Sequence, residues 1–134
     1  MPHLVNISID DVSPHPMSSV KVLDRCYEVI EVFPDVKFTL FVPMAYWRQA
    51  PPTRTEQPLE LHLYPDFCDV LRNLPKENFE IGYHGLWHGV PPHNNNDEFK
   101  EVDYALADKK LKAMFYIERL ANLGGVFKPI FRPP

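Results

Sequence analysis

Two histidines four residues apart, His84 and His88, are the side chains in this sequence best suited to chemistry. Four residues are about one helical turn, so both imidazoles can point the same way from a tight turn. Neutral imidazole is the commonest nitrogen ligand for zinc and related metals. Two histidines do not complete a metal site, and a carboxylate from elsewhere is the expected third ligand. The adjacent pair Asp10 and Asp11 is the best candidate, although such pairs are also common in solvated turns.

The spacing of apolar residues predicts four strands that alternate with three helices. We expect the strands at residues 3–9, 36–42, 79–83 and 126–131. We expect helices from Ser18 or Ser19 to about residue 32, over residues 65–74, and from about Glu98 to residue 123. Asn95 and Glu98 have the spacing of a capping box, which favours a helix start there. The proline-rich residues 44–58 are expected to form a loop.

Such alternation predicts an α/β fold with a parallel sheet and right-handed crossovers, in a single domain over residues 1–134. Sites in these sheets form at the carboxyl ends of the strands. Asp10 and Asp11 follow the first expected strand, His84 and His88 follow the third, and Arg132 follows the fourth. The candidate polar groups therefore share one edge of the sheet, which strengthens the prediction of a metal site.

Composition limits the classes of partner. The chain of 134 residues is 45% hydrophobic, enough for one buried core, and its net charge of -4 includes no basic block. Binding to nucleic acid or to an anionic membrane is therefore disfavoured. Cys26 and Cys68 form neither a disulfide framework nor a metal motif and are expected to be buried thiols. The first residues do not resemble a secretory signal, so we expect a cytoplasmic protein.

Three segments, ISIDD at residues 7–11, EIGYHGLWH at 80–88 and FRPP at 131–134, resemble in this order the first three motifs of the polysaccharide deacetylases. These carbohydrate esterases share the nodulation-factor deacetylase domain. The resemblance implies a distorted (β/α) barrel, a divalent metal, most often Zn²⁺, and removal of acetyl groups from N-acetylated carbohydrate. It assigns Asp11, His84 and His88 to the metal and Asp10 to the general base. Arg132 would steer and pair with that base.

The sequence also departs from the family pattern. Val12 stands where the family has glycine, a residue that permits backbone conformations valine resists. Gly85 replaces a serine or threonine whose side chain braces the site. The family's later motifs have no counterpart, so we expect a partial barrel, incomplete at its C-terminus, that a missing portion or a second copy would complete. Two alternatives stay open: a degenerate metal- or carbohydrate-binding module, and a hydrolase of another small amide.

Several other side chains are candidates for substrate contact. Trp87, Tyr83 and Trp47 could stack on sugar rings, although packing is the commoner fate of aromatic residues, and the same holds for Tyr46. The remaining loop histidines are expected to be surface residues; they are His15, His62 and His93.

Overall fold

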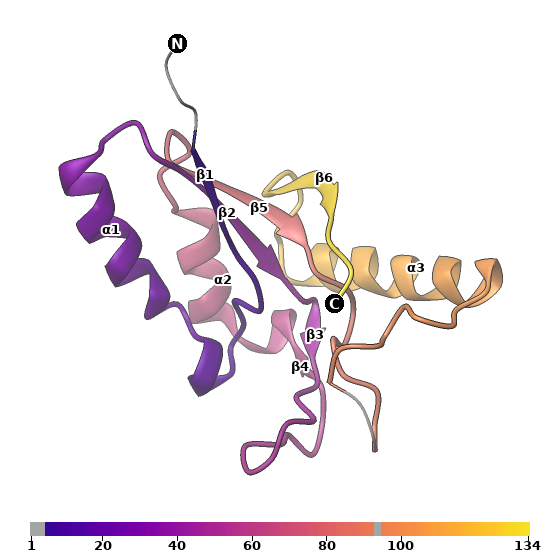
Figure 1. The fold of residues 1–134 in the computed structure, drawn as a ribbon. Helices are drawn as coiled ribbons and strands as arrows, with labels where there is room; N and C mark the ends of the chain where they lie inside the picture. The colour runs from indigo at the N-terminus through magenta and orange to yellow at the C-terminus, as the bar shows by residue number, and fades with distance from the viewer. Residues whose placement is uncertain (1–4, 93–94) are drawn as a thin grey trace.

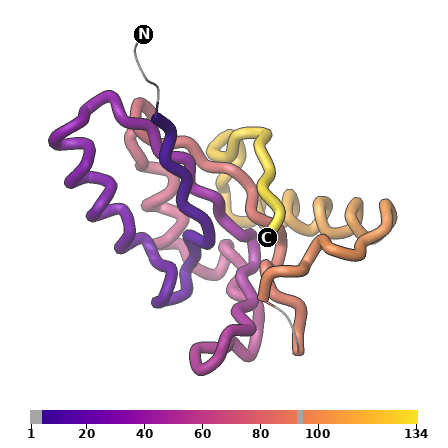
Figure 2. The backbone as a smooth tube through the Cα atoms, in the orientation of Figure 1, coloured from indigo at the N-terminus to yellow at the C-terminus, as the bar shows by residue number. Residues whose placement is uncertain are grey.

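The fold is built on one four-stranded parallel sheet, as the alternating pattern predicts. The computed structural model describes residues 5–92 and 95–134. The sheet has the order β1-β2-β5-β6, with bounds Asn6–Ile9, Lys37–Val42, Phe79–Tyr83 and Phe127–Phe131. The crossovers contain α1 (Val22–Val32), α2 (Pro65–Arg72) and α3 (Tyr104–Leu120). In Figures 1 and 2, α1 and α2 lie on one side of the sheet, and α3 runs at the β6 end.

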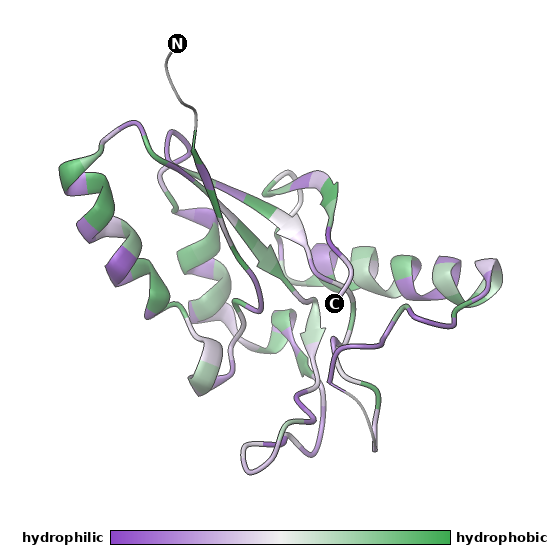
Figure 3. Cartoon of the chain, in the orientation of Figure 1, coloured by the Kyte–Doolittle hydropathy of each residue, from purple (hydrophilic) through white to green (hydrophobic). Residues whose placement is uncertain are grey.

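The core lies between the sheet and all three helices. Alternate residues of β2, namely Phe38, Leu40 and Val42, are at most 3% exposed and face the helices. This single cluster also contains Cys26 of α1, Leu71 of α2 and Met114 of α3. Much of β2 is accordingly coloured as hydrophobic in Figure 3. The opposite face of β2 is partly polar: it carries Thr39, whose hydroxyl donates a hydrogen bond to the Glu80 carboxylate at 2.7 Å.

The register of the sheet brings the ends of its strands to one edge. Ile9 pairs with Leu40, Val42 with Tyr83, and Tyr83 with Phe131. Two further hydrogen bonds extend these ladders: the His84 amide donates to the Val42 carbonyl at 3.1 Å, and the Arg132 amide donates to the Tyr83 carbonyl at 3.0 Å. The residues that follow β1, β5 and β6 are therefore neighbours.

Three expectations about element boundaries were wrong. Helix α1 begins at Val22, after a short 3-10 turn (Pro16–Ser18), with Lys21 at its N-cap. Neither expected serine caps it: the Ser18 hydroxyl pairs with the Ser13 hydroxyl at 2.7 Å, and Ser19 Oγ accepts from the Lys21 amide at 3.4 Å. Helix α3 begins at Tyr104, because Asp103 caps it by accepting the Leu106 amide at 2.8 Å, while Glu98 binds elsewhere. The expected loop contains β3 (Ala45–Tyr46), which pairs with β4 (Leu59–Glu60) in antiparallel fashion.

Helix α3 also ends earlier than expected, at Leu120 instead of residue 123. The boundaries of four other elements agree closely with expectation. Strand β5 has the predicted bounds, and β2, α2 and β6 differ from theirs by one or two residues. The expected first strand covers residues 3–9, whereas β1 begins at Asn6; residues 3–4 lie outside the described residues. A second 3-10 turn (Leu61–Leu63) precedes α2. None of the helices among the described residues is long and apolar enough to cross a membrane.

Gly82 in β5 leaves room for two large side chains, which gives a testable expectation. A Cβ atom there would lie 2.8 Å from Ile130 and 2.8 Å from Phe41. Gly82→Ala should lower the free energy of unfolding by about 1–3 kcal/mol through overpacking, measured by urea denaturation. Gly124→Ala is the matched control, since its Cβ would meet nothing within 4 Å. Equal stability of the two variants would contradict the packing argument.

Candidate metal centre

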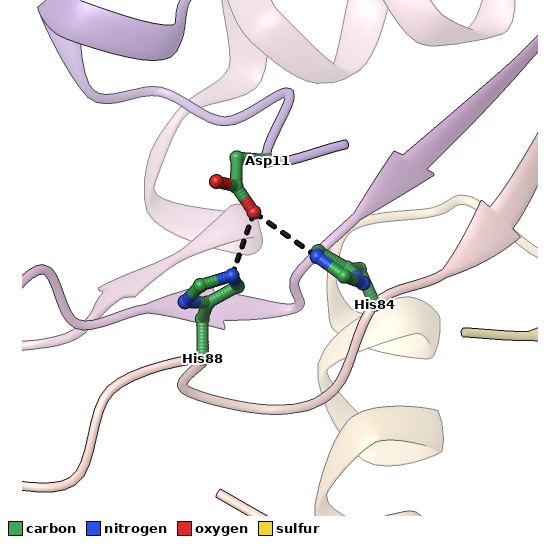
Figure 4. Close-up of side chains that lie close together, drawn as sticks. All are labelled: Asp11, His84 and His88. Carbon is green, nitrogen blue, oxygen red and sulfur yellow. Dashed lines mark ion pairs between the residues drawn. The ribbon is translucent and has the colours of Figure 1, made fainter. Parts of the chain in front are cut away.

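Three side chains from two loops converge at the carboxyl edge of the sheet. Asp11 follows β1, and His84 and His88 lie in the loop after β5. The Asp11 Oδ1 atom lies 3.0 Å from His84 Nε2 and 2.8 Å from His88 Nε2. Figure 4 draws these two contacts as dashed lines. One ligand atom from each of the three residues lies within 4.8 Å of the other two, so together they could hold a metal ion. These are the three residues that the family resemblance implies as metal ligands.

The second nitrogen of each imidazole fixes which nitrogen faces Asp11. His84 Nδ1 lies 2.7 Å from the Arg132 carbonyl oxygen, and His88 Nδ1 hydrogen-bonds to the Asn95 carbonyl oxygen. A carbonyl oxygen only accepts, so each Nδ1 carries the hydrogen and donates it. In a neutral imidazole, Nε2 then presents a lone pair. Two such lone pairs and a carboxylate oxygen therefore point to the same place, and together they are the donors of a cation site. The hydrogen bonds to the Nδ1 atoms orient the two imidazoles, as the outer partners of metal ligands do.

The electrostatics of the cluster also favour positive charge. His84 and His88 are 3% and 5% exposed. Burial of the Asp11 carboxyl opposes its ionisation, but its close contacts with the two histidines outweigh this and lower its pKa far below the usual value. Burial acts to lower the pKa of His84, but contacts with Asp11 and the Arg132 carbonyl raise it above the usual value. Asp11 Oδ1 is nevertheless buried without a well-formed hydrogen bond from any described residue.

Two of the three candidate ligands have a left-handed backbone. The φ angles of Asp11 and His88 are 64° and 62°, a conformation that is uncommon for residues other than glycine. The surrounding structure must hold such residues in place, and they cluster at functional sites. Val12 has no positive φ; its side chain is 1% exposed and joins the core. Position 12 therefore does not require the backbone freedom of glycine. The valine found here, in place of the glycine of the family pattern, is compatible with this backbone.

Glu98 is a residue of this site that the sequence argument missed. Its Oε2 atom accepts hydrogen bonds from the amides of Leu86, Trp87 and His88 at 3.1, 3.0 and 2.9 Å. Its Oε1 atom lies 3.1 Å from Lys110 Nζ. One feature of the sequence could have indicated it. Lys110 falls at helical spacing among the apolar residues of α3, and a lysine is almost never fully buried unless it is paired, so an acidic partner was to be expected.

Asp10 and Arg132 come together beside the cluster, as predicted. Arg132 Nη1 donates to Asp10 Oδ1 at 2.7 Å and to Ser8 Oγ at 3.0 Å, and its guanidinium lies 4.2 Å from the ring centre of Phe41. Both charged side chains are about two-fifths exposed, 43% for Asp10 and 41% for Arg132. The ion pair therefore contributes little to stability and serves to orient the Asp10 carboxylate.

The candidate substrate-stacking residues are all engaged in packing. Trp87 lies edge-to-face with Trp47, at 5.7 Å between ring centroids, and Lys110 Nζ is 4.3 Å from the Trp87 ring centre. Tyr83 stacks on Phe127 and donates its hydroxyl hydrogen to Glu118, so its ring contacts belong to α3 and β6 and not to the histidine cluster. Sugar stacking by Trp87, Tyr83 or Trp47 stays a prediction. Tyr46 is fully buried in β3, which contradicts an exposed stacking role.

One expectation about the other histidines was wrong. His15 is 6% exposed instead of lying on the surface. Its Nδ1 accepts the Met17 amide hydrogen at 3.0 Å, so its Nε2 donates to the Thr53 carbonyl at 3.1 Å. Tyr46 lies edge-to-face with the ring, at 6.1 Å between centroids. His62 is partly exposed and lies 3.4 Å from a Glu60 carboxylate oxygen. His93 lies outside the described residues.

The chain was compared with protein families, curated proteins and solved structures. No protein-family model, curated protein or solved structure gives a significant match to the chain.

Proposed function

We propose that this chain is a metal-dependent hydrolase of the polysaccharide deacetylase type, which removes acetyl groups from N-acetylated carbohydrate. The observation that carries the proposal is the convergence of Asp11 Oδ1, His84 Nε2 and His88 Nε2 at a single point. The order of the three sequence motifs and the Asp10–Arg132 pair next to the cluster support it. Three protein ligands leave a position open for water, which is typical of catalytic zinc sites.

The chemistry divides between the ion and the side chains of this chain. A divalent metal held by Asp11, His84 and His88 would supply a Lewis acid, which lowers the pKa of water and polarises a carbonyl group. The Asp10 carboxylate accepts the proton that the attacking water loses as its oxygen bonds to the carbonyl carbon. Arg132 holds that carboxylate in place through its 2.7 Å charge-assisted hydrogen bond. The proton on Asp10 then passes to the sugar nitrogen as the C–N bond breaks, which gives acetate and a free amine.

A second candidate function is metal binding without turnover. Polysaccharide deacetylases use a further histidine as general acid, a role that the step above gives to Asp10. Among the described residues outside the cluster, His15 is buried with both ring nitrogens occupied, and His62 lies beside Glu60. This arrangement favours the binding module, and the assay below separates the two functions.

The test begins with metal content. Purified chain is loaded with zinc, desalted, and assayed for zinc and for acetate release from a chitin oligosaccharide. The proposal expects about one zinc per chain, as in three-ligand sites, together with acetate release. Zinc without acetate would favour the binding module or the hydrolase of another small amide, which a panel of acetylated amines separates. A folded chain that retains no zinc would overturn the metal assignment.

Removal of the metal should also change stability. A ligand that binds only the folded state stabilises it by about 2.7 kcal/mol at a free concentration 100 times its Kd. Dialysis against a chelator should therefore lower the melting temperature, and added zinc should restore it. A melting temperature that does not respond to zinc would contradict binding at a site formed only in the folded chain.

A further inference from the structure

The loop that carries both histidines is folded around a carboxylate from outside it. Residues 84–88 form no helix, and their shape is not set by helical hydrogen bonds. Instead, three consecutive amides, those of Leu86, Trp87 and His88, donate to the single Oε2 atom of Glu98. Successive amides that converge in this way make a concave anion site. Here the anion is part of the same chain, and the third amide belongs to a candidate metal ligand.

Burial makes this carboxylate depend on its partners. Glu98 is 2% exposed and Lys110 is 6% exposed, and their charged atoms are 3.1 Å apart. A buried charge that loses its partner is strongly destabilising, whereas this carboxylate has three amide donors and one cation. Lys110 also lies 4.3 Å from the Trp87 ring centre, so both members of the ion pair contact the loop between the two histidines.

Gly85 shows how closely the loop fits the carboxylate. Its φ is 82°, and a Cβ atom there would lie 2.5 Å from Glu98 Oε2. Any side chain at position 85 would therefore displace the carboxylate from the three amides. Glu98 can bind the three amides only because the residue after His84 is a glycine.

We propose that Glu98 and Lys110 are positioning residues of the metal centre, which hold the loop in the shape that directs His88 Nε2 toward Asp11. This inference rests on the proposed metal site. A pair of apolar side chains could fill the same volume at equal or greater stability, since buried ion pairs contribute little net stability. Apolar groups could not hold three amides, and His88 must keep a φ of 62° to present its ring.

This role links α3 to the metal centre. Lys110 is in the second turn of α3, and Glu98 lies in the segment that leads into it. Any change that moves α3 away from the sheet removes the cation from Glu98, and with it the support of the loop. Metal affinity should therefore report the position of this helix, although no α3 residue belongs to the described ligand cluster.

The test compares Glu98→Gln, Lys110→Met and the double variant with two controls, Glu101→Gln and Lys109→Met, whose parent side chains are exposed. Two quantities are measured on each folded variant: zinc affinity by competition with a coloured chelator, and the visible absorption spectrum at saturating cobalt. Outer hydrogen-bond partners of metal ligands change affinity by about 10- to 100-fold, and we expect a loss in this range for the three site variants. The controls should stay within about twofold of the parent chain.

The cobalt spectrum separates positioning from simple stability. A variant that is only less stable binds cobalt with the parent spectrum, whereas a displaced His88 alters the ligand geometry and the spectrum at saturation. The double variant buries no unpaired charge, so it decides the question if Glu98→Gln does not fold. Parent affinity and spectrum in the double variant would overturn the inference and leave the metal site standing. A parent chain that binds no metal would overturn the proposed function itself, and this inference with it.

Discussion

Replacing His88 with alanine should lower the affinity of the chain for zinc by about 10²- to 10³-fold. Zinc sites of known small domains hold the metal with about 10–16 kcal/mol, so one of three or four ligands accounts for roughly 3–4 kcal/mol. The His88 ring is also the ligand most dependent on its loop, since Asn95 holds its Nδ1 and Glu98 holds its amide. The measurement is competition with a coloured chelator on the folded variant.

His62→Ala is the matched control for this experiment. His62 belongs to no three-residue ligand cluster among the described residues, and its removal should leave zinc affinity within about twofold. Equal zinc affinity for the parent chain and His88→Ala would show that Asp11, His84 and His88 do not form the site.

Replacing Asp10 with asparagine should sharply reduce the rate of hydrolysis while leaving metal binding intact. Asparagine has nearly the same shape and keeps an oxygen that can accept from Arg132, but its amide does not take up the proton of the attacking water. A general base contributes about 10²- to 10⁴-fold to the rate, so kcat should fall by that factor. Acetate release and zinc affinity are measured on the same preparation.

Asp35→Asn controls for the general effect of removing a carboxylate. Asp35 is exposed and precedes β2, at the end of the strands opposite to the metal centre. Its replacement should change neither quantity. If Asp10→Asn lost zinc affinity as well as activity, Asp10 would be a ligand and not the base. If it kept full activity, the proposed path of the proton would be wrong.

The parts of this molecule that depend on local pattern could be predicted from sequence. The β-branched and apolar runs of β2 and β5 mark buried strands, and parallel pairing then places the residues after each strand at one edge. That reasoning places the Asp10–Asp11 pair, His84 and Arg132 at the same edge. It needed no knowledge of the loops, because the register of the sheet fixes where each loop begins. The choice of Asp11 as a ligand and the pairing of Arg132 with Asp10 came instead from the resemblance to the polysaccharide deacetylases.

The parts that depend on contacts between distant segments could not be predicted in this way. Glu98 has the spacing of a helix-capping residue, and nothing local shows that its carboxylate instead binds the loop of residues 84–88. The start of α3 was wrong for the same reason: Glu98 binds the loop, and Asp103 caps the helix instead. The burial of His15 likewise involves contacts with Thr53 and Tyr46, which lie far from it in sequence.

The origin of the three candidate ligands in opposite halves of the chain has a consequence for how the molecule folds. Asp11 and His84 become neighbours only after β1, β2 and β5 have paired in register. Closing such long loops is costly in entropy and occurs late, so an ion finds few correctly placed ligands in the unfolded chain or in an early intermediate. Contacts absent from the transition state change the rate of unfolding and not that of folding. Zinc would then act on the lifetime of the finished structure and leave the time needed to reach it unchanged.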